Sequence, residues 1–135
     1  MKEITVKAEL DMLDEVIAFV EEQLEAADCP MKTQMQISVA VEELFVNIAH
    51  YAYPPKTGDA TITMEIKGDP KYAEIIFEDT GVPYNPLEKP DPDITVSAEE
   101  RPIGGLGIFM VKKSMDEMLY EYTDGKNIVT IRKTL

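Results

Sequence analysis

An acidic and an amide side chain stand four residues apart in residues 41–47, where Glu43 precedes Asn47. Because residues four apart on an α-helix lie on the same face, one turn apart, these side chains would be neighbours. A carboxylate can take a proton from a hydroxyl group, and an amide oxygen can join water and phosphate oxygens around Mg²⁺. The pair suggests proton transfer beside a metal-bound phosphate, and a solvated helix face is the simpler alternative.

A first glycine-containing turn, Asp79-Thr80-Gly81, lies downstream at the expected end of a strand. A partly buried carboxylate there could accept a hydrogen bond from an exocyclic amine such as that of adenine. Gly81 would leave room for the base. The same residues are also common in an ordinary turn, so this motif does not decide between the two interpretations by itself.

A second turn, Gly104-Gly105-Leu106-Gly107, opens directly into a predicted helix. Glycines allow close approach to backbone amides, and a helix N-terminus carries a positive dipole end, so the turn suits phosphates. The alternative is a hinge that permits tight helix packing. The chain has neither a Walker A sequence nor glycines that follow a parallel strand, so a P-loop or Rossmann site is disfavoured.

Three other residues could bear on function. Arg101 is the one basic residue in a long acidic stretch before the second turn; it could stabilise phosphate charge or pair with a nearby glutamate. His50 lies one turn after Asn47, and we interpret it as a residue of the helix border rather than a catalyst. Cys29 is the only cysteine, which excludes an internal disulfide.

The hydrophobic pattern predicts the elements that position these residues. We expect strands over residues 2–8, 60–67, 72–78, 117–123 and 127–134, and helices over residues 10–27, 34–52 and 107–115. The proline-rich, acidic segment at about 82–103 is expected to be a ligand-responsive lid. This order predicts an α+β fold, a two-layer sandwich whose mixed, mostly antiparallel sheet is covered on one face by helices, in a single domain over residues 1–135.

Composition narrows the function classes. A net charge of −13 in 135 residues disfavours non-specific binding to nucleic acid or to an anionic membrane, although a cation and local donors could still hold ATP. The sequence has no apolar run long enough to span a bilayer and no signal-peptide pattern at its start. A cytoplasmic location is therefore expected.

Taken together, the three motifs resemble those of the Bergerat-fold ATPases, the GHKL superfamily with histidine-kinase-like ATPase domains. Glu43 and Asn47 match its Glu-x-x-x-Asn box, Asp79 and Gly81 its Asp-x-Gly box, and residues 105–107 its Gly-x-Gly box. From the length of the sequence we expect neither histidine-bearing dimerisation helices before these motifs nor a transducer domain after them. The chain is most similar to the stand-alone anti-sigma-factor serine/threonine kinases of bacteria, in residues 42–53, 79–86 and 105–117.

The resemblance implies a role for each matched residue. Glu43 would be the general base toward a serine of an anti-anti-sigma partner, and Asn47 would bind Mg²⁺. Asp79 would hold the adenine amine of ATP, with Gly81 beneath the base. The phosphates would lie on the amides of Gly105, Leu106 and Gly107, with Arg101 near the position of a phosphate-contacting arginine. Relatives are commonly homodimers that sequester a sigma factor.

One departure from the family pattern concerns the last strand. Where the family often has Gly-Thr-Thr, with a threonine that helps to hold adenine, this chain has Lys126-Asn127-Ile128-Val129, and Asn127 could substitute. The expected function is an ATP-dependent serine/threonine protein kinase; the alternatives are a nucleotide-responsive binding module and a free-standing ATPase. Glu43 favours the kinase, because ATP binding alone requires only the other motifs.

Overall fold

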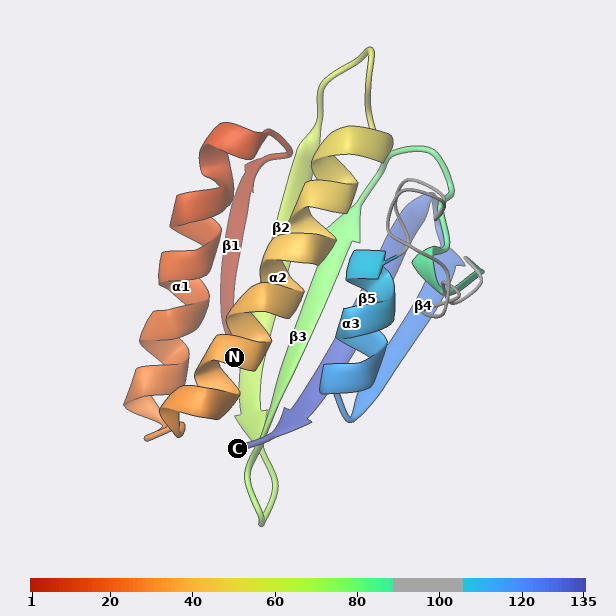
Figure 1. The fold of residues 1–135 in the computed structure, drawn as a ribbon. Helices are drawn as coiled ribbons and strands as arrows, with labels where there is room; N and C mark the ends of the chain where they lie inside the picture. The colour runs from red at the N-terminus through yellow and green to blue at the C-terminus, as the bar shows by residue number, and fades with distance from the viewer. Residues whose placement is uncertain (89–105) are drawn as a thin grey trace.

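A five-stranded antiparallel sheet forms the base of the fold in the computed structural model, which describes residues 1–88 and 106–135. The strand order is β1-β2-β3-β5-β4 (Figure 1). The strands are β1 Lys2–Lys7, β2 Asp59–Lys67, β3 Tyr72–Asp79, β4 Glu117–Thr123 and β5 Lys126–Thr134. All five begin and end within one or two residues of the predicted positions.

Three α-helices cover one face of this sheet (Figure 1): α1 Leu13–Ala26, α2 Met31–Tyr51 and α3 Leu106–Ser114. Short 3₁₀ turns occur at Leu10–Met12 and Pro86–Glu88. The predicted α+β two-layer sandwich is confirmed. The sheet is antiparallel in each pairing of the described strands rather than mixed, because β4 reverses the chain before β5 returns beside β3.

Helix α2 is central to the core. Its stripe of Ile37, Val41, Leu44 and Phe45 is buried against inward-facing strand residues such as Phe77. The helix begins at Met31, three residues before the predicted start at residue 34. Pro30 occupies the N-cap position with φ −58° and ψ 144°, so the helix starts directly after the proline. The longer helix keeps Glu43 and Asn47 well inside a regular α-helix, so their spacing does place them on one face.

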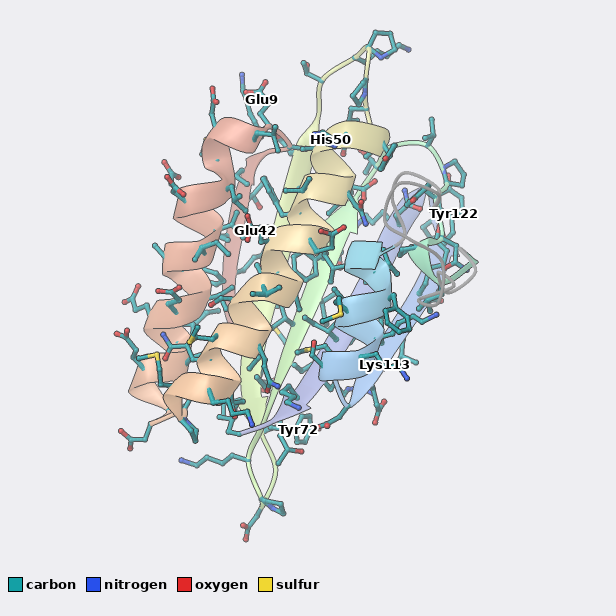
Figure 2. All side chains as sticks on the ribbon, viewed as in Figure 1. Glu9, Glu42, His50, Tyr72, Lys113 and Tyr122 are labelled. Carbon is teal, nitrogen blue, oxygen red and sulfur yellow. The ribbon has the colours of Figure 1, made fainter. Side chains whose placement is uncertain are left out.

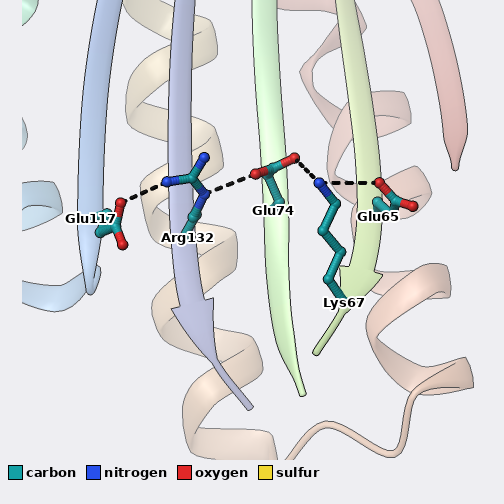
Figure 3. A network of polar contacts seen from close by, with 5 residues as sticks. All are labelled: Glu65, Lys67, Glu74, Glu117 and Arg132. Atoms are coloured by element: carbon teal, nitrogen blue, oxygen red, sulfur yellow. Dashed lines mark hydrogen bonds and ion pairs between the residues drawn. The ribbon is translucent and has the colours of Figure 1, made fainter. Parts of the chain in front are cut away.

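A ladder of charged side chains crosses the sheet face opposite the helices (Figure 3). At its centre Glu74 is only 8% exposed and accepts hydrogen bonds at 2.8 Å from Lys67 Nζ and from Arg132 Nε. Glu65 extends the ladder beyond Lys67, and Glu117 extends it beyond Arg132. The ladder therefore links β2, β3, β5 and β4 side by side. None of the described helices has the length and apolar character needed to cross a membrane.

Candidate functional site

A small pocket lies where the last turns of α2 meet the end of β3 and the start of β5. Most of its wall is apolar, with Leu44, Ile48, Phe77 and Val129 among the lining side chains. Three polar side chains interrupt that wall: Asn47, Asp79 and Asn127. An apolar cleft with a few convergent polar groups has the composition of a small-molecule site.

Asp79 is the acidic group of the pocket, and it is 7% exposed. Its Oδ1 accepts hydrogen bonds of 2.9 Å from the backbone N–H of Gly81 and from Nδ2 of Asn127. Burial raises the pKa of Asp79 above its ordinary value, and the two hydrogen bonds oppose that rise. Within the described part of the chain, neither of these bonds uses Oδ2, so this oxygen is the available acceptor.

Gly81 brings the chain that follows β3 against the end of α2. A Cβ atom at Gly81 would overlap the backbone carbonyl of Ala52, and the neighbouring Val82 N–H donates to that same carbonyl at 2.9 Å. Ala52 and Val82 line the pocket, whereas Gly81 itself is not among the lining residues. Gly81 thus shapes the wall beside Asp79 through close backbone approach.

Two tyrosines close one side of the pocket. The ring of Tyr51, from α2, stacks on the ring of Tyr84, which follows β3, with centroids 5.2 Å apart and planes inclined by 18°. Both rings line the pocket. Their stack connects the helix layer to the segment after β3, and it presents aromatic surface to any planar ligand.

Glu43 lies against the first turn of α3. A Cβ atom at Gly107 would overlap the carboxyl group of Glu43, so the absence of a side chain at Gly107 is what lets the two helices meet there. Glu43 on α2 and Gly107 on α3, which are 64 residues apart in the sequence, are therefore neighbours in the fold. A proton acceptor is placed at a helix N-terminus, where anions bind favourably.

Asn47 completes this side of the site. It lines the pocket, and its Nδ2 is buried with no hydrogen-bond partner in the described residues. An unpaired buried donor is costly, so this amide nitrogen fits an acceptor that residues 1–88 and 106–135 do not supply. The described residues contain no group of three or more His, Cys, Asp or Glu side chains able to hold a metal. A hard cation beside Asn47 would thus need phosphate or water oxygens as further ligands.

The remaining candidates differ in their positions. Arg101 and Gly105 lie outside the described residues, as do residues 89–103 of the predicted lid; only residues 82–88 of it are described, and they contribute to the pocket wall. His50 is exposed near the end of α2 (Figure 2), edge-on to Tyr51 with centroids 6.1 Å apart, and is not a lining residue. The placement of His50 agrees with its interpretation as a border residue.

Asn127 has a larger role than the sequence suggested. It is 3% exposed and makes hydrogen bonds to Asp79, Val82, Tyr84 and Tyr120. One feature of the sequence could have indicated this. Asn127 lies on the same inward-facing side of β5 as Val129 and Ile131, where the alternating pattern predicts an apolar residue.

The fold is a two-layer α+β domain with a pocket between its central helix and its sheet. Asp79 lies in this pocket, and a second acid, Glu43, lies beside Gly107. This arrangement is typical of a nucleotide-binding domain. Residues 6–133 match the family model described as the histidine kinase-like ATPase domain. The chain belongs to this family, and the resemblance drawn from the three motifs is confirmed at that level.

Curated relatives are serine kinases. The chain is 29% identical over 97 residues to the serine-protein kinase RsbW of Bacillus mycoides strain KBAB4 and to that of Bacillus cereus strain ATCC 10987. It is 30% identical over the same length to the RsbW of Bacillus cereus strain B4264. The matches cover 69% of this chain and 59% of each relative, so the chain spans somewhat more than half of the length of the relatives it matches.

Proposed function

We propose that this protein is an ATP-binding anti-sigma regulatory factor that transfers the γ-phosphate of ATP to a serine of an anti-anti-sigma partner. The observation that carries the proposal is the contact between Glu43 and the first turn of α3 at Gly107. A domain that only binds nucleotide needs the pocket and the glycine amides. A carboxylate held beside Gly107 could supply the proton acceptor that a phosphoryl transfer to a hydroxyl additionally requires.

The proposed position of ATP follows from the pocket. The exocyclic amine of adenine would donate to Oδ2 of Asp79, and the ring would lie among the apolar side chains beside Tyr51 and Tyr84. The amide oxygen of Asn47 would bind Mg²⁺, and its buried amide nitrogen, which has no hydrogen-bond partner in the described residues, would donate to a phosphate oxygen. The phosphates would continue toward the amides of Gly105, Leu106 and Gly107, with Arg101 as a further phosphate contact.

In the proposed reaction the serine hydroxyl oxygen forms a bond to the γ-phosphorus while the bond from that phosphorus to the β–γ bridging oxygen breaks. ADP leaves with the bridging oxygen, and the hydroxyl proton moves to the carboxylate of Glu43. Mg²⁺, when bound, would neutralise charge on the phosphates. Most of the acceleration in such a transfer comes from positioning and electrostatic stabilisation, which is consistent with a site that has few chemical groups.

The proposed serine acceptor is supported by the relatives, which are called serine-protein kinases, and the anti-anti-sigma partner is inferred from the family resemblance. We propose that the protein acts as a homodimer in the cytoplasm, that one domain spans residues 1–135, and that it also sequesters a sigma factor. Adenine nucleotide and serine phosphorylation would set which partner is bound. A nucleotide-responsive module without kinase activity is the outcome that remains if ATP binds and no phosphate is transferred.

The test combines two measurements on the full chain. Mg-ATP is titrated by calorimetry, and transfer of label from γ-labelled ATP to a candidate anti-anti-sigma protein is followed on a gel. Glu43→Gln should lower transfer by about a hundredfold or more, the usual contribution of a general base, while ATP affinity stays within a few-fold of wild type. Glu42→Gln is the matched control, because Glu42 is exposed on the same helix (Figure 2) and should leave transfer unchanged.

Each outcome has a clear meaning. No ATP binding at millimolar nucleotide would remove the whole proposal, and equal transfer by wild type and Glu43→Gln would remove Glu43 from its role. Asn47→Ala should weaken ATP binding more in the presence of Mg²⁺ than in its absence. A loss of equal size with and without Mg²⁺ would show that Asn47 contacts the nucleotide and not the ion.

A further inference from the structure

Asn127 stands opposite Asp79 in the register of β5 and β3, at the first inward-facing position of β5. Its side chain is buried at the floor of the pocket, next to the only acid among the described lining residues. A buried amide is tolerated only where its hydrogen-bonding groups are paired. The pairing of Asn127 therefore shows what its side chain can and cannot do.

The amide of Asn127 has no hydrogen-bonding capacity left. Its Nδ2 donates to Oδ1 of Asp79 and to the backbone carbonyl of Val82, both at 2.9 Å. Its Oδ1 accepts from the backbone N–H of Tyr84 at 3.1 Å and from the hydroxyl of Tyr120 at 2.5 Å. A primary amide offers two N–H donors and two lone pairs, and all four are used. Asn127 is thus saturated by protein groups before any ligand arrives.

We propose that Asn127 is a positioning residue, which selects the nucleobase without touching it by fixing which oxygen of Asp79 faces the pocket. This inference rests on the proposed binding of ATP. Two donors, Gly81 N–H and Asn127 Nδ2, converge on Oδ1 of Asp79, and they hold the carboxylate in one orientation. Oδ2 then remains as the acceptor that neither donor occupies. Because Oδ2 of a carboxylate only accepts hydrogen bonds, it would pair with an amine of the base and would repel a carbonyl oxygen in the same place.

The same side chain also holds the pocket wall. Through Val82 and Tyr84 it fastens the segment after β3, and this segment places the Tyr84 ring on Tyr51. Through Tyr120 it ties the edge strand β4 to the floor. The base-binding acid and the aromatic wall are therefore held by a single residue, and loss of Asn127 would loosen both at once.

The charge state of Asp79 gives a readout that a merely structural role would not change. Burial raises the pKa of Asp79, and the bond from Asn127 lowers it, because a donated hydrogen bond favours the carboxylate. Removing Asn127 should raise the pKa further. The other titratable groups that line the pocket and the adjoining groove with Asp79 are Tyr51, Tyr84, Asp59, Glu78 and Lys126, and Tyr120 reaches it through Asn127.

The first experiment needs no nucleotide. The pKa of Asp79 is measured by carboxyl carbon NMR in wild type, Asn127→Ala and Asn127→Val; the valine variant suits a strand and serves if alanine prevents folding. Thr130→Val is the control, because Thr130 lies on the same strand with its side chain on the opposite face. We expect a higher Asp79 pKa in the Asn127 variants alone. An unchanged Asp79 pKa in a folded Asn127 variant overturns the proposal.

The second experiment measures ATP and GTP affinity from pH 5 to pH 8. In wild type, ATP affinity should fall as Asp79 becomes protonated. In the Asn127 variants this fall should occur at higher pH, with affinity at pH 8 lower by roughly tenfold to a hundredfold, as for loss of a bond to a charged group. A parallel loss for ATP and GTP with an unchanged pH midpoint would contradict base selection. Failure of wild type to bind ATP would refute the proposed function, while the NMR titration still decides the positioning role.

Discussion

At the scale of single residues, two glycines shape the candidate site. The space that a side chain would take at each glycine is filled by a different kind of neighbouring group. The space beside Gly81 is filled by the backbone of Ala52, which is held in place by the end of α2. The space beside Gly107 is filled by the carboxyl end of Glu43, a flexible side chain. Backbone moves only with its helix, whereas a side chain can change rotamer, so equal substitutions should have unequal effects.

We expect Gly81→Ala to lower the free energy of unfolding by about 1–3 kcal/mol, the range for overpacking a filled site. Gly107→Ala should cost less stability, because Glu43 can swing away, but it should reduce phosphoryl transfer by displacing the proton acceptor. Urea unfolding and the labelled-ATP assay separate the two effects. The prediction is wrong if Gly107→Ala is the more destabilising change or if it leaves transfer intact.

At the scale of elements, the charged ladder holds four strands together on the face that no described helix covers (Figure 3). Its centre, Glu74, has a pKa lowered first by the hydrogen bond from Lys67 and then by that from Arg132. The stabilisation that accompanies a lowered carboxylate pKa is complete above the unfolded-state value. It is lost as the pH falls through the folded-state pKa, because both states then bind the proton.

Glu74→Gln should therefore destabilise the protein by about 1–2 kcal/mol at pH 7, a figure reduced for the partial exposure of Lys67 and Arg132. The ordinary glutamate pKa is 4.5, so the difference from wild type should shrink as the pH falls from this value. Denaturant unfolding at pH 7 and pH 3 checks the trend. Glu121→Gln, an exposed change on β4, is the control, and a difference that grows in acid would contradict the sign.

The elements themselves are largely predictable because their hydrophobic periodicity is clear. The apolar stripe of α2 and the alternation of the strands indicate the α+β sandwich and the helix that carries Glu43 and Asn47. The predicted start of α2 is three residues too late because Pro30 has the pattern of a helix breaker, although a proline is tolerated where a helix begins. The antiparallel β3–β5 pair could not be predicted, since local periodicity does not specify which strands become neighbours.

The candidate site could be proposed from the sequence as a set of residue types, whereas its contacts could not. Order and spacing indicated Glu43, Asn47, Asp79 and the glycine turns, yet no sequence rule places Glu43 against Gly107 or saturates Asn127. Those facts depend on how α3 crosses α2 and on the register of β5 against β3. Long-range packing of this kind depends on the whole core. The local sequence gives only weak signals of it, such as the polar residue at position 127.

At the scale of the whole molecule, the formal net charge of −13 acts against compactness. Like charges repel over the Debye length, which falls from about 30 Å at 0.01 M salt to about 10 Å at 0.1 M. The thermal midpoint of the protein should therefore rise as sodium chloride increases over that range. Calorimetric scans in chloride check this, and a falling midpoint would show that ion pairs such as the ladder outweigh general repulsion.

The space shared by Gly107 and Glu43 also limits the routes by which this chain can evolve. A descendant that lost the glutamate first would have room at position 107, and side chains could accumulate there without a penalty. A glutamate restored afterwards would have to take another rotamer, so it would no longer lie against α3 and would not regain its proposed role. Loss of Glu43 alone could be reversed by one substitution. Loss of Glu43 followed by a larger side chain at position 107 could not.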